Sequence, residues 1–238
     1  MMANQRNLDI IGNNLLNSET AGYRAERALY SAFELQMMSV TDQSGQKLLG
    51  DGKGYPIVTV EGEKTLFEPG PVENTDRSLD VAITGDGFFN VTGEDGKSYL
   101  TRNGSFDLDT EGYLVLPGIG RVMGTNGYIK AMRSDVTIGP DGTVMSAQGT
   151  SLGKIKISEP PDYSTLARTE TGMFTTDAAT PDSTNFSLVQ KSLEQSNVNT
   201  NVEYLNLIAI QRAFQSCSSA LSTVDSINRK AAQQLAAV

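Results

Sequence analysis

The stretch LIAIQRAFQSCSSALSTVDSINRKAAQQLAAV, residues 207–238, has an apolar residue at almost every seventh position in two series. The first series is Leu207, Phe214, Leu221, Asn228 and Leu235, and the second is Ile210, Cys217, Val224, Ala231 and Val238. Such a 3.5-residue repeat predicts a helix with one narrow apolar stripe that another helix must cover.

The beginning of the chain carries a shorter version of the same repeat. Leu8 and Leu15 follow Met1 at seven-residue steps, and Ile11 falls on the second series. The repeat predicts a helix from Met1 to about Asn17, although the GNN run at 12–14 consists of poor helix formers that packing must hold in place. We therefore expect the two terminal helices to form a coiled-coil-like pair.

Ser and Thr side chains crowd the predicted C-terminal helix at residues 216–223, where they compete with the backbone for hydrogen bonds. Packing against neighbours supplies most helix stability in proteins. We therefore expect partner-dependent folding of this helix, in preference to a stable solitary helical hairpin. Asn199, Thr200 or Asn201 is expected to cap its start, with Glu203 in the first turn.

The segment between the helices is predicted to be a β-hairpin meander. Gly-containing turns recur at regular steps, at Asp95-Gly96, Glu111-Gly112, Asn126-Gly127 and Asp141-Gly142. The steps of about fifteen residues leave room for two short strands per period. Leu79, Val81 and Ile83 alternate as on the buried face of a strand.

Other segments give less definite predictions. YPIVTVEG, KTLFEPGPVENT and GKIKIS read as single strands. Residues 162–190 are rich in Thr, Asp and Ala, and MFTTDAATPDS within them reads as loop or sheet edge. Residues 24–38 have apolar residues at both periods, so helix and strand both stay open. Residues 41–54 are polar and Gly-rich, which indicates a mobile loop.

The fold class is therefore mainly β with α-helical termini. Residues 1–36 and 191–238 are expected to form a helical assembly domain and residues 76–165 the central β domain, with connectors at 37–75 and 166–190.

Composition argues against several classes of function. The net charge is −9 with no histidine, which disfavours nucleic-acid binding and removes the commonest general base and zinc ligand. No stretch approaches the ~18 apolar residues of a membrane span, and no cleavable secretory signal opens the chain. Cys217 is the only cysteine, so an internal disulfide is excluded, and its place on the stripe predicts burial.

Two local motifs are better explained by turns than by metal binding or catalysis. DLDTEG, residues 107–112, resembles the start of a calcium loop, but Gly118 stands where the bidentate glutamate belongs, so a hairpin turn is favoured. Acidic residues such as Glu94 and Asp95 are adjacent in a turn, and nothing nominates a converging catalytic pair. We expect no enzyme activity, no cofactor and no metal.

Three blocks occur in the order that is found in a known family. NLDIIGNNLLNSETAGYRAER, SLDVAITGDGFFNV with YLTRNGSFDLDTEGYLV, and SNVNTNVEYLNLIAIQRAFQ resemble signatures of bacterial flagellar axial proteins of the rod and hook group, best the rod proteins (proximal or distal). The blocks extend from near Met1 to near Ser226, and together they are specific. Relative to this family the chain opens inside the first helix, so we expect a trimmed or late start.

The resemblance implies a structural subunit of the hollow flagellar rod. Its terminal helices would pack into an inner coiled-coil tube with other rod or hook subunits and copies of itself. It would travel unfolded through the flagellar export apparatus to the periplasmic rod, without nucleic-acid binding or membrane insertion. Two other functions stay open: an extracellular β-rich binding module on a helical stalk, and an acidic hydrolase.

We expect the assembly interface to be formed by side chains on or beside the two stripes. Within it, Asn228 is expected either to be exposed near a fraying end or to fix the register, and Arg212 either to be exposed or to pair with an acid of a neighbouring subunit. The predicted interface residues are Leu8, Ile11, Asn14, Leu15, Leu207, Ile210, Arg212, Phe214, Cys217, Leu221, Val224 and Asn228.

Overall fold

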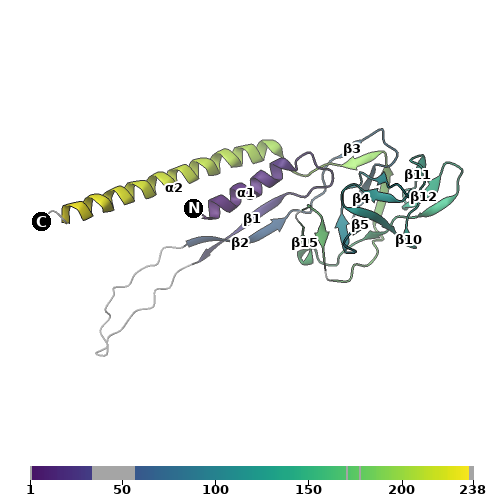
Figure 1. The fold of residues 1–238 in the computed structure, drawn as a ribbon, viewed down its shortest axis with the longest axis horizontal. Helices are drawn as coiled ribbons and strands as arrows, with labels where there is room; N and C mark the ends of the chain where they lie inside the picture. The colour runs from purple at the N-terminus through teal and green to yellow at the C-terminus, as the bar shows by residue number, and fades with distance from the viewer. Residues whose placement is uncertain (1, 34–56, 170, 177, 236–238) are drawn as a thin grey trace, which may run out of the picture. The chain divides into compact units, whose positions relative to one another are not determined.

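The structure is a computed structural model that describes residues 2–33, 57–169, 171–176 and 178–235. It is mainly β with a helix near each end, α1 (Met2–Leu16) and α2 (Thr200–Leu235), as predicted (Figure 1). The chain divides into two compact units. The terminal unit comprises Met1–Leu15, Glu26–Leu66 and Thr200–Val238, and the β unit comprises Leu16–Ala25 and Phe67–Asn199. The predicted mobile loop at 41–54 lies outside the described residues.

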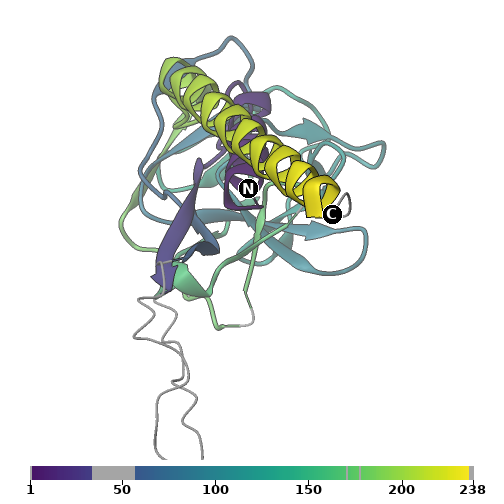
Figure 2. The same cartoon turned by 90° about the vertical axis from the view of Figure 1, so that its left-hand side faces the viewer.

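In the terminal unit α1 lies beside the first part of α2, and the two run in opposite directions (Figures 1 and 2). Their lengths differ, with 15 residues in α1 and 36 in α2. At 1.5 Å per residue α1 extends about 22 Å and α2 about 54 Å. The coiled-coil-like pair is therefore realised only in part, because α1 is too short to cover the whole stripe of α2.

The third element of the terminal unit is an antiparallel ribbon of β1 (Glu26–Phe33) and β2 (Ile57–Thr65). It settles the open alternative for residues 24–38 in favour of a strand at 26–33. The prediction of two separate strands, YPIVTVEG and KTLFEPGPVENT, is wrong at their junction, because β2 runs from Ile57 to Thr65. The strand continues through the junction with a bulge, since Leu29 pairs with Gly62 and Tyr30 with Val60, which leaves Glu61 as the extra residue.

One buried amide holds α1 against the ribbon. Asn14 is 1% exposed, and its Nδ2 donates to the carbonyl of Glu26 while its Oδ1 accepts from the Glu26 N–H, both at 2.9 Å. The side chain thus satisfies both backbone groups at the start of β1. This contact explains how a helix with poor helix formers at 12–14 is stabilised.

The β unit is built around one large sheet with the strand order β15-β16-β6-β5-β9-β8-β7, to which β10 adds at β9 and β14 at β5. Its strands are β5 (Phe88–Gly93), β6 (Ser98–Thr101), β7 (Asp107–Leu108), β8 (Leu114–Leu116), β9 (Gly120–Gly124), β10 (Gly127–Tyr128), β14 (Ile157–Ser158), β15 (Ala167–Arg168) and β16 (Phe174–Thr175).

The four predicted glycine turns are confirmed as hairpin turns. Gly96, Gly112, Gly127 and Gly142 all have positive φ, between 77° and 113°, a conformation that glycine adopts without strain. They join β5 to β6, β7 to β8, β9 to β10, and β11 (Val136–Ile138) to β12 (Thr143–Ser146).

The predicted meander is realised only in part, because β6 does not pair with β7 and β5 lies between β6 and β9. After β6 the chain turns to β4, where the Val81 N–H donates to the Gly104 carbonyl at 3.0 Å. A Cβ at Gly104 would lie 1.7 Å from the Val81 carbonyl oxygen, so only glycine permits this approach. The following hairpins are thereby added on the other side of β5.

The return segment is also more ordered than predicted. Residues 186–190 form a strand, β17 (Phe186–Gln190), which pairs over its whole length with β4 (Val81–Gly85). Strand β18 (Ser192–Glu194) pairs with β3 (Val72–Asn74). The predicted GKIKIS strand is divided between β14 and β13 (Ser151–Lys154), which extends the β11-β12 sheet.

The hydrophobic core of the β unit is continuous and includes Leu79, Val81 and Ile83, as the alternation predicts. A second cluster packs Phe88 against Phe174 and Leu100. The β unit thus encloses its apolar residues within its own fold.

A buried ionic cluster lies where segments enter and leave the β unit. The Glu194 carboxylate accepts from Arg24 at 2.6 Å, from Arg102 at 3.3 Å, and from the Gly70 N–H at 3.0 Å. Arg24 and Glu194 are each 1% exposed. Burial lowers the pKa of the Arg102 guanidinium, while Glu194 acts in the opposite direction. The cluster joins three segments that lie close to where the chain passes from one unit to the other. Arg24 is near the boundary at 25/26, Gly70 near the boundary at 66/67 and Glu194 near the boundary at 199/200.

Candidate assembly interface

The apolar stripe of α2 is partly buried near the start of the helix and exposed further along it. Leu207, Ile210 and Phe214 are half-buried, whereas the later members are exposed: Leu221 at 51% and Val224 at 53%. Apolar side chains also protrude elsewhere on α2, at Val202, Tyr204, Leu205, Ile208 and Ile227. A run of exposed apolar side chains along one helix is typical of an interaction surface.

The polar and small members of the predicted interface on α2 are also exposed. Cys217 is exposed, so its predicted burial is wrong for the single chain. Asn228 lies within the helix, seven residues before its end at Leu235, and its register role stays a prediction. Arg212 is exposed and forms no ion pair with any residue that the structure describes. Residues 236–238, with Val238 of the second series, lie outside the description.

The N-terminal candidates lie at the inner side of the terminal unit. Ile11 is buried, Leu8 and Leu15 are half-buried, and Asn14 is engaged by the β1 backbone. The heptad pattern missed Ile10, which is as buried as Ile11. The adjacent isoleucine pair at 10–11 was the available signal, since two neighbouring apolar residues widen a stripe beyond a strict heptad.

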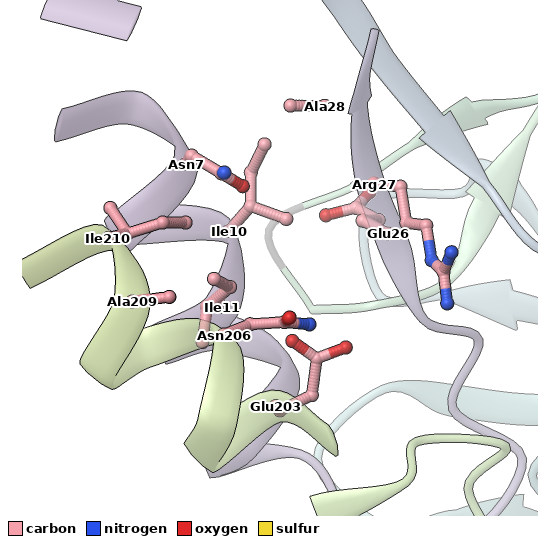
Figure 3. Close-up of a pocket in the computed structure, with 10 residues that line it drawn as sticks. All are labelled: Asn7, Ile10, Ile11, Glu26, Arg27, Ala28, Glu203, Asn206, Ala209 and Ile210. Atoms are coloured by element: carbon pink, nitrogen blue, oxygen red, sulfur yellow. The ribbon is translucent and has the colours of Figure 1, made fainter. Parts of the chain in front are cut away.

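A pocket of about 230 Å³ opens where α1, β1 and α2 meet (Figure 3). Its apolar wall comes from both helices and the strand, and its polar lining comes from amide and carboxylate side chains together with Arg27. The lining residues are Asn7, Ile10, Ile11, Glu26, Arg27, Ala28, Glu203, Asn206, Ala209 and Ile210. The sequence pattern missed Asn7, Glu203 and Asn206 as site residues, because a polar group in a cavity leaves no periodic signal.

Glu203 is the most unusual member of this pocket. It is only 6% exposed, and its side chain points from the first turn of α2 into the space beside Asn206 and Glu26 (Figure 3). Its carboxylate forms no hydrogen bond or ion pair with another residue of the described ranges. Its place in the first turn confirms the prediction and suits the positive end of the helix dipole.

The motifs that suggested other chemistry have structural roles. Asp109 of the DLDTEG motif accepts from the N–H groups of Glu111 and Tyr113 in a hairpin turn, and Arg121 pairs with both Asp109 at 2.8 Å and Glu111 at 2.7 Å. Within the described residues no group of three or more acidic or cysteine side chains is placed to hold a metal ion. None of the described helices is long and apolar enough to cross a bilayer.

Comparison with known proteins identifies the class. Residues 82–146 match the family described as "Flagellar hook protein FlgE/F/G D1 domain", and residues 189–234 match "Flagellar basal body rod FlgEFG protein C-terminal". The first match covers the core of the β unit, and the second covers β18 and most of α2. The two matches therefore fall on the β unit and on the C-terminal helix of this chain.

Full-length relatives give the particular family. The chain is 32% identical to the flagellar basal-body rod protein FlgF of Caulobacter vibrioides, over 98% of this chain and 94% of the relative. It is 30% identical to FlgG of Agrobacterium fabrum (94% and 92%) and 32% identical to FlgG of Bacillus subtilis (94% and 91%). The chain belongs to the flagellar basal-body rod protein family. It is a structural protein of the bacterial flagellum, the organelle of motility, and it assembles with other flagellar subunits.

Proposed function

We propose that this rod subunit assembles through the stripe of α2 together with α1. The observation that supports the proposal is the exposure of the distal stripe, from Cys217 to Asn228, in an otherwise folded chain. Burying a Leu or Val side chain contributes about 1.5–3 kcal/mol. Leaving such residues in water is unfavourable unless a neighbouring subunit covers them.

The proposal also covers the domain organisation, the location and the export of the chain. Residues 1–36 and 191–238 form the assembly domain and residues 76–165 the central β domain. Residues 37–75 and 166–190 connect the two; the first segment contributes β2 to the terminal unit and β3 to the β unit, and the second contributes β15–β17 to the β unit. Copies of the chain and other rod or hook subunits are its neighbours in the periplasmic rod. The export apparatus delivers it, and it catalyses no reaction and needs no cofactor.

Replacing Leu221 by aspartate tests the assembly role. Because Leu221 is half exposed and remote from α1 along the helix, Leu221→Asp is expected to leave the monomer folded and to reduce rod incorporation and motility at least 100-fold, the cost of ~3 kcal/mol for a buried unpaired charge. The measurements are circular dichroism of the purified chain, and immunoblotting of isolated basal bodies with a swarming assay.

Ser219→Asp is the matched control. Ser219 is exposed on the same helix, two residues from Leu221 and thus about 200° around the axis. It is expected to assemble normally. Normal incorporation of Leu221→Asp would contradict the proposed interface.

A further inference from the structure

The pocket around Glu203 is incomplete in the single chain. A buried carboxylate normally has a charged or hydrogen-bonding partner, because desolvating it alone is costly. The Glu203 residue is only 6% exposed, its carboxylate faces the open pocket, and no described side chain bonds to it. Arg27 contributes to the lining, but its guanidinium extends on the far side of β1 from Glu203 (Figure 3).

The lining indicates the chemistry of a fitting group. Ile10, Ile11 and Ile210 offer an apolar wall, while Glu203, Asn7 and Asn206 offer a carboxylate and two amides. The pocket volume of 230 Å³ exceeds several times the ~30 Å³ that one water occupies in the liquid. An apolar stem with a cationic, multiply donating head meets these conditions, which describes an arginine side chain.

The distal part of α2 offers such a side chain beside its uncovered stripe. Arg229 is exposed and forms no ion pair with the described residues. It follows Leu221 by eight residues, which places it about 80° from Leu221 around the helix axis. Lys230 is about 180° from Leu221 and therefore lies on the opposite side.

We infer that the pocket around Glu203 receives Arg229 from a second copy of this chain. Within one chain, 26 residues of continuous helix separate Glu203 from Arg229, about 39 Å, so the pairing must be between copies. The contact places the distal part of one α2 against the pocket side of another, which α2 lines with Glu203, Asn206 and Ile210. The inference rests on the proposed function and specifies the register of its interface.

Thiol cross-linking in isolated basal bodies tests the pairing. Glu203→Cys with Arg229→Cys, in a Cys217→Ser background, is treated with a short bis-maleimide reagent. Linked multimers of the chain are expected, with the 203–229 linkage identified by mass spectrometry. Glu203→Cys with Lys230→Cys is the matched control and is expected to give at least ten times less product.

A second measurement avoids any change in the pocket. A photo-cross-linking residue replaces only the exposed Arg229, and its adducts are expected on peptides that contain residues 7–11 or 203–210 of another copy. Glu203→Gln, which keeps the shape but removes the charge, is expected to lower incorporation on the order of 10-fold, whereas Asp225→Asn has little effect.

The outcomes separate the two proposals. If the chain is present in basal bodies but both cross-links are absent, or join it to a different protein, the pairing is overturned and the proposed function stands. If the unmodified chain is absent from basal bodies, the proposed function is overturned and the pairing with it.

Discussion

The β unit buries its large apolar side chains, whereas the terminal unit leaves many of those on α2 exposed. The β unit buries Phe89, Val91, Phe106 and Val122 completely, and an ionic cluster around Glu194 joins its first and last segments. The terminal unit leaves most of α2 exposed. A self-contained unit and an open helix in one chain indicate that the first is stable alone while the second is completed by neighbours.

The difference has a physical origin in topology. In the β unit the hairpins fold the chain back so that apolar side chains pack against one another. A 36-residue helix beside a 15-residue helix, in contrast, cannot be covered along its whole length. Changes in the β unit should therefore alter stability, and changes on distal α2 should alter assembly with little effect on stability. The following experiments test this contrast.

The largest effect is expected for Glu194→Ala. Two buried guanidinium groups, Arg24 and Arg102, would lose their carboxylate, and breaking a buried ion pair costs about 3–5 kcal/mol. Urea unfolding followed by the strand signal in circular dichroism measures the loss. Glu73→Ala is the control, because Glu73 is exposed and accepts one bond from Gln195 at 3.2 Å, and it should change stability little. Equal stability of the two variants would contradict the anchoring role of the cluster.

Leu188→Ala tests the strand that the sequence did not predict. Leu188 is buried at the contact of β17 with β4, so its truncation is expected to cost about 2–4 kcal/mol in the free energy of unfolding. Its neighbour Val189 is exposed on the same strand, and Val189→Ala should cost much less. A similar loss for both variants would be inconsistent with the observed orientation of β17.

Asn14→Ala tests the anchor of α1 in the terminal unit. The change leaves the N–H and carbonyl of Glu26 without their partner, at a cost of about 1–3 kcal/mol. Hydrogen exchange is expected to accelerate in residues 2–16 and to stay unchanged in β5 and β9. Gln5→Ala, at an exposed position of the same helix, serves as the control. Unchanged protection of α1 in Asn14→Ala would show that the amide does not hold the helix.

The smallest effect is a dependence of β-unit stability on acid. Hydrogen bonds lower the pKa of three turn carboxyls from the ordinary value of 3.8: Asp141 through the Thr143 hydroxyl and N–H, Asp95 through the Lys97 N–H, and Asp162 through the Ser164 N–H. A lowered pKa in the folded state stabilises above about pH 3.8, and this contribution is lost as the pH falls through the folded-state pKa.

Asp141→Asn should reduce this dependence, since an amide keeps an acceptor oxygen without titrating. Melting temperatures at pH 7, 4 and 3 measure it, with Asp135→Asn as the control, because Asp135 is exposed and accepts no hydrogen bond from the described residues. If the melting temperature of Asp141→Asn changed with pH as much as that of the unmodified chain, the Asp141 carboxyl would not be a cause of the pH dependence.

The sequence determined the features that depend on neighbours along the chain. The seven-residue repeat predicted α2, and the glycines at 96, 112, 127 and 142 predicted four hairpin turns, because period and positive φ are local properties. Only the tertiary structure decided the strand order around β5, the pairing of β17 with β4, and the burial of Asn14, Glu194 and Glu203. These features join residues far apart in the sequence, where long-range packing and hydrogen bonding choose among arrangements that the local pattern permits equally.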